Sequence, residues 1–571
     1  MTIAMRRRID SIDALYLVLI IGFAALVRSD ISLSYPGYQL TADSPSYLTA
    51  ANNIYTKLFF FHQVRPPLYP FFISVVYWVF GYKNLNAVVA CQYLMGIVTV
   101  LIVFLTLKRL TGNRVLAFAL ALVFSLDRIP VFYERMIMTE ALAYLLLSAL
   151  IFQSVVCAGR GSMGGSAIAS LGFLTIANAL CKPILFYTAI PTFLLIGIKT
   201  HLAGGRSVAK TLRAGLWYAG IVFAVIFSLL LANALVSRAP EEKFRVPIGI
   251  SFYRKCVSYK MQRYIPDSFA AIKRLANTPR SLATETIWNA CRGWAEKEGK
   301  DPVYFWDMIG DVGCLVARGH PLEYALNSAL LMFKLYPMEE RHYLIEMAPP
   351  GEGSRIGAVT VFFDKKIFSP LYAYLFFIAA FVYLLTLISG RFLNNNLSGR
   401  ATLIFGHYIL YVSVIAVTGW CAYPRLLYIV NPLILFLGAC CLENTIRLCA
   451  LPSSGVSGLS RLSRTARRRP ILLAAVGLLM TAAAAGVLAY LMIGHRLIED
   501  IYRDAAPPIL NSFIIVNPSR PLGFYTHKAD TAAALIAVSV AILAGYTGFG
   551  LSKTNGPKDR IDNPQKREVR V

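Results

Sequence analysis

The sequence predicts an all-α polytopic membrane protein: a bundle of about 12 transmembrane helices with juxtamembrane helices and one large outer loop. Two observations predict this fold class. Of the 571 residues, 57% are hydrophobic and only 15% are charged, whereas soluble domains carry about 25% charged residues. The apolar residues also gather in blocks of roughly the 20 residues that a membrane-spanning helix needs. The same composition excludes a disordered, collagen-like or disulfide-rich secreted chain.

The apolar blocks set the expected spans. The net charge of +26 does not indicate a nucleic-acid-binding protein, because the basic residues flank these blocks instead of clustering on one polar domain. The blocks that qualify as spans, or nearly so, are 12–28, 86–107, 114–132, 140–158, 166–181, 183–199, 214–236, 369–389, 401–420, 425–442, 471–493 and 531–551.

One further apolar stretch, residues 66–82, is short and opens with two prolines. If it lies at the membrane surface and the amino terminus is inside, the inner segments hold 25 basic and six acidic residues, a net charge of +19, which leaves +7 for the rest of the chain. If it crosses, the basic blocks 108–114 and 461–469 face outward, against the positive-inside rule. The charge pattern therefore predicts a juxtamembrane helix.

These spans divide the chain into segments. Residues 1–236 form a membrane module with a first outer loop at 29–85, and 237–367 an extracytoplasmic loop subdomain. Further core helices occupy 368–445, followed by a basic cytoplasmic linker at 446–470, two additional spans within 471–551 and a basic cytoplasmic tail at 552–571. Within the loop, 320–336 has apolar residues at helical spacing and predicts an amphipathic helix. Cys256, Cys291 and Cys314 share the loop, so one disulfide is an alternative there.

Two carboxylates stand at the outer ends of predicted helices: Asp43 in DSPSY and Glu140 in MTEALA. Each has a structural explanation, because an aspartate before Ser-Pro caps a helix and a glutamate at a helix start is favoured by the helix dipole. Together, in a chain whose spans hold few acids, they indicate a functional site at the membrane boundary.

The order of motifs resembles the GT-C class of glycosyltransferases, which use polyprenyl-phosphate sugars and include protein mannosyltransferases and the lipid A aminoarabinose transferase. The resemblance rests on the acid in DSPSYLTAA, on RPPLYPFF, on the basic loop LKRLTGNR and on MTEALA. It continues in NALCKPILFY at 178–187 and YPRLLYIVNPLILFL at 423–437, and covers about residues 12–200 and 369–442.

The resemblance implies transfer of a sugar from a polyprenyl-phosphate-linked donor to a lipid, glycan or protein acceptor. It also implies a site that faces the periplasm or exterior, on a bacterial cytoplasmic membrane. Such a reaction needs a carboxylate that accepts the acceptor's proton, cations for the phosphate and an apolar groove for the lipid. The sequence indicates no specific cofactor, and a bound divalent cation is an open alternative.

The expected roles follow from these needs. We expect Asp43 to act as the base and Glu140 to orient the acceptor. For Glu140 two alternatives are that it binds a cation or holds a cationic partner. Arg65, Lys182 and Arg425 are the expected donor-phosphate contacts. The expected substrate contacts are Tyr47, Tyr69, His62, Arg135 and Tyr428.

The cations and His62 have structural alternatives. Arg65 is also placed to reach lipid headgroups, as basic side chains at an interface do. Arg135 has the alternative of balancing Glu134, and His62 that of an interfacial residue beside a phenylalanine triplet.

Two other functions stay open. One is a different lipid-carrier enzyme, such as a glycan ligase or polymerase, which would rely on a large late loop. The other is a transporter or flippase. Transporters often show two similar halves and charges near the midplane, whereas the polar residues here gather at one rim.

Overall fold

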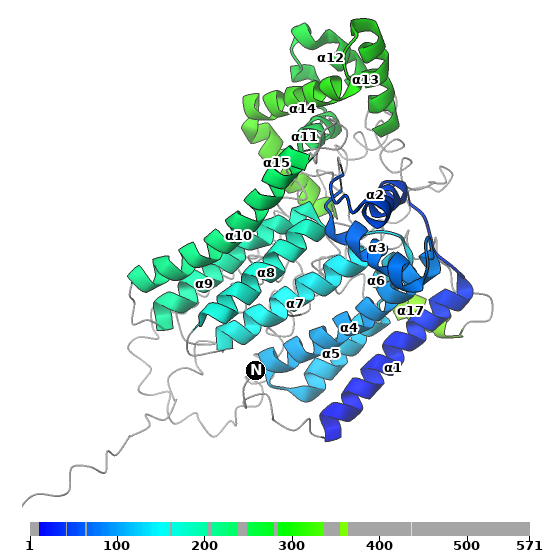
Figure 1. Cartoon of the computed structure of the whole chain (residues 1–571), viewed down its shortest axis with the longest axis vertical. Coiled ribbons are helices and arrows are strands. Elements are labelled where there is room, and N and C mark those ends of the chain that lie inside the picture. Colours follow the sequence, from blue (N-terminus) through cyan, green and yellow to red (C-terminus); the bar gives the residue numbers. More distant parts are fainter. Residues whose placement is uncertain are drawn as a thin grey trace, which may run out of the picture. The chain divides into compact units, whose positions relative to one another are not determined.

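The computed structural model describes residues 11–41, 43–62, 65–159, 163–203, 208–236, 248–278, 284–335, 355–363 and 436. The chain divides into two compact units, and every described residue belongs to the unit made of Met1–Cys440 and Tyr490–Phe524. The described elements are helices (Figure 1).

Four of the described helices are long and apolar enough to cross a membrane, or five if one bent pair counts as a span. The four are α1 (Ser11–Ser34), α4 (Leu85–Thr111), α7 (Glu140–Gly159) and α10 (Val208–Val236); the bent pair is α5 (Arg114–Leu126) with α6 (Arg128–Arg135). Shorter apolar helices are α3 (Leu68–Phe80) and α8 (Gly165–Cys181).

These helices confirm a mostly helical chain with apolar helices that suit a membrane. The count of about 12 spans stays a prediction, because the expected spans 369–389, 401–420, 471–493 and 531–551, and all of 425–442 except Phe436, lie outside the described residues.

Two expected spans are interrupted. The block 114–132 is not one straight helix: α5 ends at Leu126, and α6 follows at an angle of 45°. The break lies at Asp127, whose Oδ1 accepts a hydrogen bond from the amide of Ile129 at 3.0 Å and so caps α6. The block 183–199 starts as a 3₁₀ helix over Pro183–Thr188, and α9 (Ala189–Ala203) follows it.

An ion pair fixes the relative direction of α1 and α4. Asp13, near the start of α1, pairs with Lys108 in the last turn of α4, and Arg114 lies 3.8 Å from the same carboxylate. The two helices are therefore antiparallel, and the segment between them begins and ends at the opposite end of the bundle. We call these the Asp13 end and the Asp43 end.

Two short helices occupy the segment between α1 and α4. They are α2 (Ser44–Lys57) and α3, which pack against each other. With 13 residues, α3 is about 20 Å long at about 1.5 Å per residue, shorter than a bilayer core of about 30 Å. The stretch 66–82 thus forms a helix too short for a standard span.

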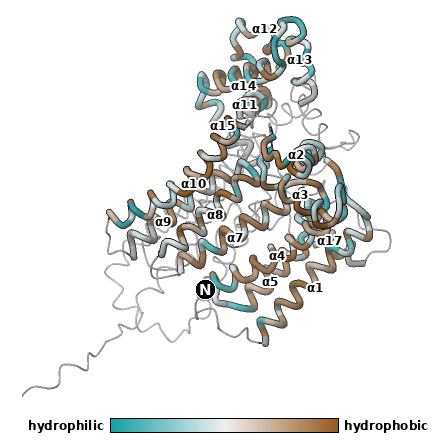
Figure 2. Tube along the Cα trace, viewed as in Figure 1, coloured by the Kyte–Doolittle hydropathy of each residue, from teal (hydrophilic) through white to brown (hydrophobic). Residues whose placement is uncertain are grey.

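The membrane helices pack side by side (Figure 1). Helix α1 contacts α4 and α5, α4 contacts α7, α7 contacts α8, and α10 contacts α8 and α9. Figure 2 shows that these helices are predominantly hydrophobic. Their buried side chains, among them Ile20, Phe104, Leu147, Leu171 and Tyr218, form one apolar core.

A late helix also packs on α1. This is α17 (Arg355–Phe363), which contacts α1. Arg128, at the start of α6, pairs with Asp30 of α1 at 2.9 Å and donates to Thr360 Oγ1 of α17 at 2.9 Å. One buried arginine therefore joins three helices.

The helices of 248–335 have an apolar core of their own. They are α11 (Ile248–Ser258), α12 (Ala270–Ala276), α13 (Thr284–Glu298), α14 (Pro302–Gly319) and α15 (Pro321–Leu335). The core includes Tyr253, Ile287 and Phe305. Helix α15 matches the amphipathic helix expected at 320–336.

The loop cysteines are not disulfide-bonded. Cys256, Cys291 and Cys314 are all free, so the disulfide alternative is wrong. Cys256 and Cys291 are buried in the apolar core, where a thiol packs as a small hydrophobic side chain.

Candidate active site

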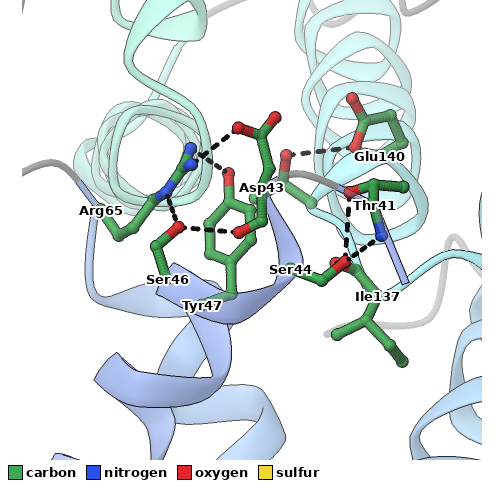
Figure 3. A network of polar contacts seen from close by, with 9 residues as sticks. Thr41, Asp43, Ser44, Ser46, Tyr47, Arg65, Ile137 and Glu140 are labelled. Atoms are coloured by element: carbon green, nitrogen blue, oxygen red, sulfur yellow. Dashed lines mark hydrogen bonds and ion pairs between the residues drawn. The ribbon is translucent and has the colours of Figure 1, made fainter. Parts of the chain in front are cut away.

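Asp43 directs its carboxylate to Arg65 instead of to the helix that it precedes (Figure 3). Asp43 occupies the N-cap position of α2, yet its side chain makes no capping hydrogen bond. Arg65 Nη2 lies 2.8 Å from Asp43 Oδ1. Because a capping aspartate would accept hydrogen bonds from the first helical turn, the structure does not support the capping explanation.

Arg65 is held by the first turn of α2. Its Nε donates to Ser46 Oγ at 2.7 Å and its Nη1 to Tyr47 OH at 3.3 Å. Its guanidinium carbon also lies 4.3 Å from the centre of the Tyr47 ring, a cation–π contact. The planar fork of arginine thus makes contacts that a lysine could not make together. The side chains of Arg65 and Asp43 keep 19% and 15% of their surface exposed, so solvent or a substrate reaches both.

Glu140 forms the second pair of the site. It begins α7, its side chain is 1% exposed, and its Oε1 accepts a hydrogen bond from Lys182 Nζ at 2.8 Å. Lys182 follows the last residue of α8, where its own side chain is 11% exposed. A buried carboxylate needs such a partner, since desolvating a lone charge is expensive. The pair therefore anchors the end of α8 to the start of α7.

Backbone contacts join the segments that carry the two carboxylates. Gln39 and Met136 form an isolated parallel bridge: the Gln39 amide donates to the Arg135 carbonyl and the Ile137 amide donates to the Gln39 carbonyl, each at 3.1 Å. Ser44, the first residue of α2, donates from its Oγ to the Ile137 carbonyl at 3.0 Å (Figure 3). Asp43 and Glu140 therefore lie at the same end of the bundle, on segments that are held together.

Tyr47 and Tyr69 form the aromatic part of the site. Their rings meet edge to face with centroids 5.2 Å apart. Tyr69, on α3, is fully buried, and its hydroxyl donates to Gln92 Oε1 of α4 at 2.7 Å. Tyr69 therefore contacts Tyr47 and Gln92, and Tyr47 in turn contacts the partly exposed Arg65.

His62 lies close to Arg65. Burial and the positive charge of Arg65 lower the pKa of His62 below its usual value. The neutral imidazole is therefore the form that this environment favours.

Arg135 contacts the first outer loop. Its Nε donates to the Gly37 carbonyl at 3.3 Å, and its guanidinium stacks 5.0 Å from the Tyr35 ring centre. Glu134 instead pairs with Arg28 of α1 at 2.6 Å. The alternative that Arg135 balances Glu134 is not supported.

The remaining expected site residues, Arg425 and Tyr428, lie outside the described residues. Their assignments as a donor-phosphate contact and a substrate contact stay predictions.

Three residues of the site were not expected from the sequence: Ser44, Ser46 and Gln92. The serines lie within the DSPSY motif, so their positions beside Asp43 were a usable signal. Gln92 is one amide within the apolar block 86–107. A polar side chain in a spanning block is itself a signal, because it needs hydrogen-bond partners inside the bundle.

The site has no ready-made metal cluster. Among the described residues, no group of three or more His, Cys, Asp or Glu side chains converges as metal ligands. The divalent-cation alternative therefore stays a prediction. What the described residues do offer is two carboxylate–cation pairs, one partly exposed and one buried.

Comparisons with known proteins found solved structures only. No family model and no curated protein matches the chain. It is similar to the oligosaccharyltransferase of Archaeoglobus fulgidus in the apo form, at 11% identity and a TM-score of 0.40 over 96% of this chain and 57% of that one. It is also similar to the archaeal oligosaccharyltransferase AglB from the same organism in complex with an inhibitory peptide and a dolichol-phosphate, at 12% identity and a TM-score of 0.39 over 93% and 56%. The chain thus spans little more than half the length of these relatives, and TM-scores this low assign no fold family.

Proposed function

We propose that this chain is an integral membrane glycosyltransferase of GT-C architecture. It transfers a sugar from a polyprenyl-phosphate-linked donor to a lipid, glycan or protein acceptor. The active site lies at the Asp43 end of the bundle, which faces the periplasm or exterior of a bacterial cytoplasmic membrane.

One observation carries this proposal. The partly exposed Asp43–Arg65 pair and the buried Glu140–Lys182 pair sit on segments joined by the Gln39–Met136 bridge. A carboxylate that removes a proton and cations that bind a phosphate are the two requirements of sugar transfer from a lipid phosphate. Both kinds of group occur together at the Asp43 end of this bundle.

In the proposed reaction the acceptor hydroxyl attacks the anomeric carbon of the donor sugar. As the new carbon–oxygen bond forms, Asp43 accepts the hydroxyl proton, and the bond between the sugar and the phosphate oxygen breaks. The electron pair leaves with the polyprenyl phosphate, whose negative charge Arg65, Lys182 and Arg425 stabilise.

The other residues of the site bind the substrates in this proposal. Glu140 orients the acceptor, and Tyr47, Tyr69, His62, Arg135 and Tyr428 line the site. The helices of 248–335 help to choose the acceptor.

The experiment compares envelope lipids and glycans by mass spectrometry in cells with and without the gene. The mass that disappears identifies the transferred sugar and its acceptor. The deletion strain is then complemented with wild type, with Asp43→Asn, and with Asp267→Asn, which removes a carboxylate that is 93% exposed in the loop helices.

Wild type and Asp267→Asn should restore the missing product, and Asp43→Asn should not, at equal amounts of protein in the membrane. Full restoration by Asp43→Asn would remove Asp43 as the base. A change in the distribution of a lipid across the membrane, with no sugar lost from any product, would instead favour the transporter.

A further inference from the structure

We infer that Gln92 is a positioning residue that holds the Asp43 and Glu140 halves of the site at a fixed separation. The inference rests on the proposed function for its kinetic consequence. Its structural content, a clamp between three segments, stands on the contacts of Gln92 alone.

Gln92 uses every polar group of its side chain. It lies on α4 and is completely buried. Its Oε1 accepts the hydroxyl of Tyr69 at 2.7 Å. Its Nε2 donates to the carbonyls of Glu134 at 2.6 Å and Met136 at 2.9 Å, so each of the two amide hydrogens has a carbonyl partner.

One side of this clamp leads to Asp43. The Gln92 amide fixes the hydroxyl of Tyr69, and the Tyr69 ring supports the edge of Tyr47. The Tyr47 ring in turn packs against the guanidinium of Arg65, which pairs with Asp43. A shift of Tyr69 is therefore transmitted to the carboxylate through packed rings and one guanidinium.

The other side leads to Glu140. The two carbonyls that Gln92 binds belong to Glu134, in the last turn of α6, and to Met136, in the short stretch that leads to Glu140 at the start of α7. Met136 also forms the bridge to Gln39, and the next residue, Ile137, accepts the hydroxyl of Ser44. Gln92 thus binds Met136 in the same short stretch that the first outer loop contacts at Met136 and Ile137.

The chemistry of this position calls for a primary amide. It must offer one acceptor and two donors within one flat group, and only asparagine and glutamine do so. Asparagine is one methylene shorter and cannot reach all three partners at these distances, and methionine has the shape but none of the polar groups.

The test uses the full chain in lipid nanodiscs, with the variants Gln92→Met and Gln92→Asn. The matched control is Thr106→Val, which removes a fully buried hydroxyl from the same helix that bonds only within its own turn, to the Ile102 carbonyl. Hydrogen–deuterium exchange by mass spectrometry reports the amides of Gln39 and Ile137, whose hydrogen bonds form the bridge. Steady-state kinetics of sugar transfer give kcat and KM for the donor.

Both Gln92 variants should exchange the Gln39 and Ile137 amides at least about tenfold faster, while the amides of α4 stay protected. Their kcat should fall about tenfold or more with donor KM within about twofold, because donor contacts remain and only the geometry is lost. Thr106→Val should match wild type in both measurements. A general loss of stability would instead raise exchange throughout α4.

Unchanged exchange at Gln39 and Ile137 in Gln92→Asn overturns the inference, as does an equal effect of Thr106→Val. If wild type transfers no sugar from any donor, the proposed function fails, and the exchange measurement still decides whether Gln92 is the clamp. Gln92→Asn keeps the amide, so it serves as the second variant where Gln92→Met does not fold.

Discussion

Lys182 Nζ lies 2.8 Å from Glu140 Oε1 and joins the residue after α8 to the first residue of α7. The lysine that the sequence assigns to the donor phosphate therefore has a carboxylate partner 42 residues earlier in the chain. Two roles follow for Lys182, counter-ion and phosphate ligand, and a pair of variants tests the first.

Lys182→Met should lower the free energy of unfolding by about 3–5 kcal/mol, because it leaves the buried Glu140 carboxylate without this partner. The double variant Glu140→Gln/Lys182→Met should recover most of that loss. Thermal unfolding in detergent measures both. The outcome against the pairing is a double variant that is less stable than either single one.

Arg65→Lys should lower kcat/KM about tenfold to a hundredfold, since a lysine cannot contact Asp43, Ser46 and Tyr47 together. A loss of this size corresponds to about 1.4–2.8 kcal/mol of transition-state stabilisation. Initial rates with the identified donor measure it. The control is Arg263→Lys, because Arg263 forms an exposed ion pair with Glu323 in the loop helices. Its kcat/KM should stay within about twofold of wild type. Equal rates for the two variants would show that the fork geometry of Arg65 is unimportant.

Gly96→Ala should destabilise the membrane helices by about 3 kcal/mol or more. A methyl group at Gly96 of α4 would overlap with Glu134 Oε1 and Arg28 Nη2, so the buried pair would have to separate. Gly22→Ala is the matched control on α1, because a methyl group there meets nothing within 4 Å. That control should be neutral or slightly stabilising, as alanine favours helices over glycine. Similar melting temperatures for both variants would contradict the close packing at Gly96.

Gly313→Ala should loosen the crossing of α11 and α14. The added methyl group would overlap with the backbone of Tyr253, which cannot give way as a flexible side chain can. Burial raises the pKa of the nearby Cys256 thiol to about 12, so at pH 8 this cysteine should react with maleimide very slowly in wild type and much faster in Gly313→Ala.

Peptide mapping by mass spectrometry measures the labelling of Cys256. Gly293→Ala on α13 is the control, because nothing lies within 4 Å of the position of its methyl group. Fast labelling of wild-type Cys256 would show that the crossing is open without any substitution.

Leu40→Cys and Val115→Cys should be labelled from opposite sides of the membrane. Leu40 lies beside the bridge at the Asp43 end and is 50% exposed, and Val115 is the second residue of α5, at the Asp13 end, and is 64% exposed. A membrane-impermeant maleimide added to intact cells, and then to inverted vesicles, tests the sidedness. Labelling of Val115→Cys in intact cells would reverse the proposed orientation.

Hydropathy predicted the long apolar helices well because each is a nearly uninterrupted apolar block, as in α4 and α10. It failed at Asp127, because a window of about 20 residues averages over a single polar residue. That residue caps α6, so one helix ends there and a new one begins at an angle. The 3₁₀ start at Pro183 was missed for the same reason, since the stretch stays apolar while its backbone changes.

The sequence predicted Asp43, Arg65, Glu140 and Lys182 as candidate site residues by their residue type and their place at the ends of apolar blocks. It did not predict which of them pair, because the partners are 22 and 42 residues apart and meet only through the packing of α2, α7 and α8. Gln92 stands out in the sequence as an amide within an apolar block, but its three partners lie on Tyr69, Glu134 and Met136, and only the tertiary structure shows them.

The contact between Arg128 and Thr360 has a consequence for biosynthesis. The two residues are 232 positions apart. The ribosome therefore synthesises α1 to α6 well before it adds Thr360, whose hydroxyl completes this junction. During that interval the contacts that hold α1 to α6 include the Asp30–Arg128 pair and the Arg28–Glu134 pair. A fragment that ends before residue 355 would lack α17 and the hydrogen bond from Arg128 to Thr360.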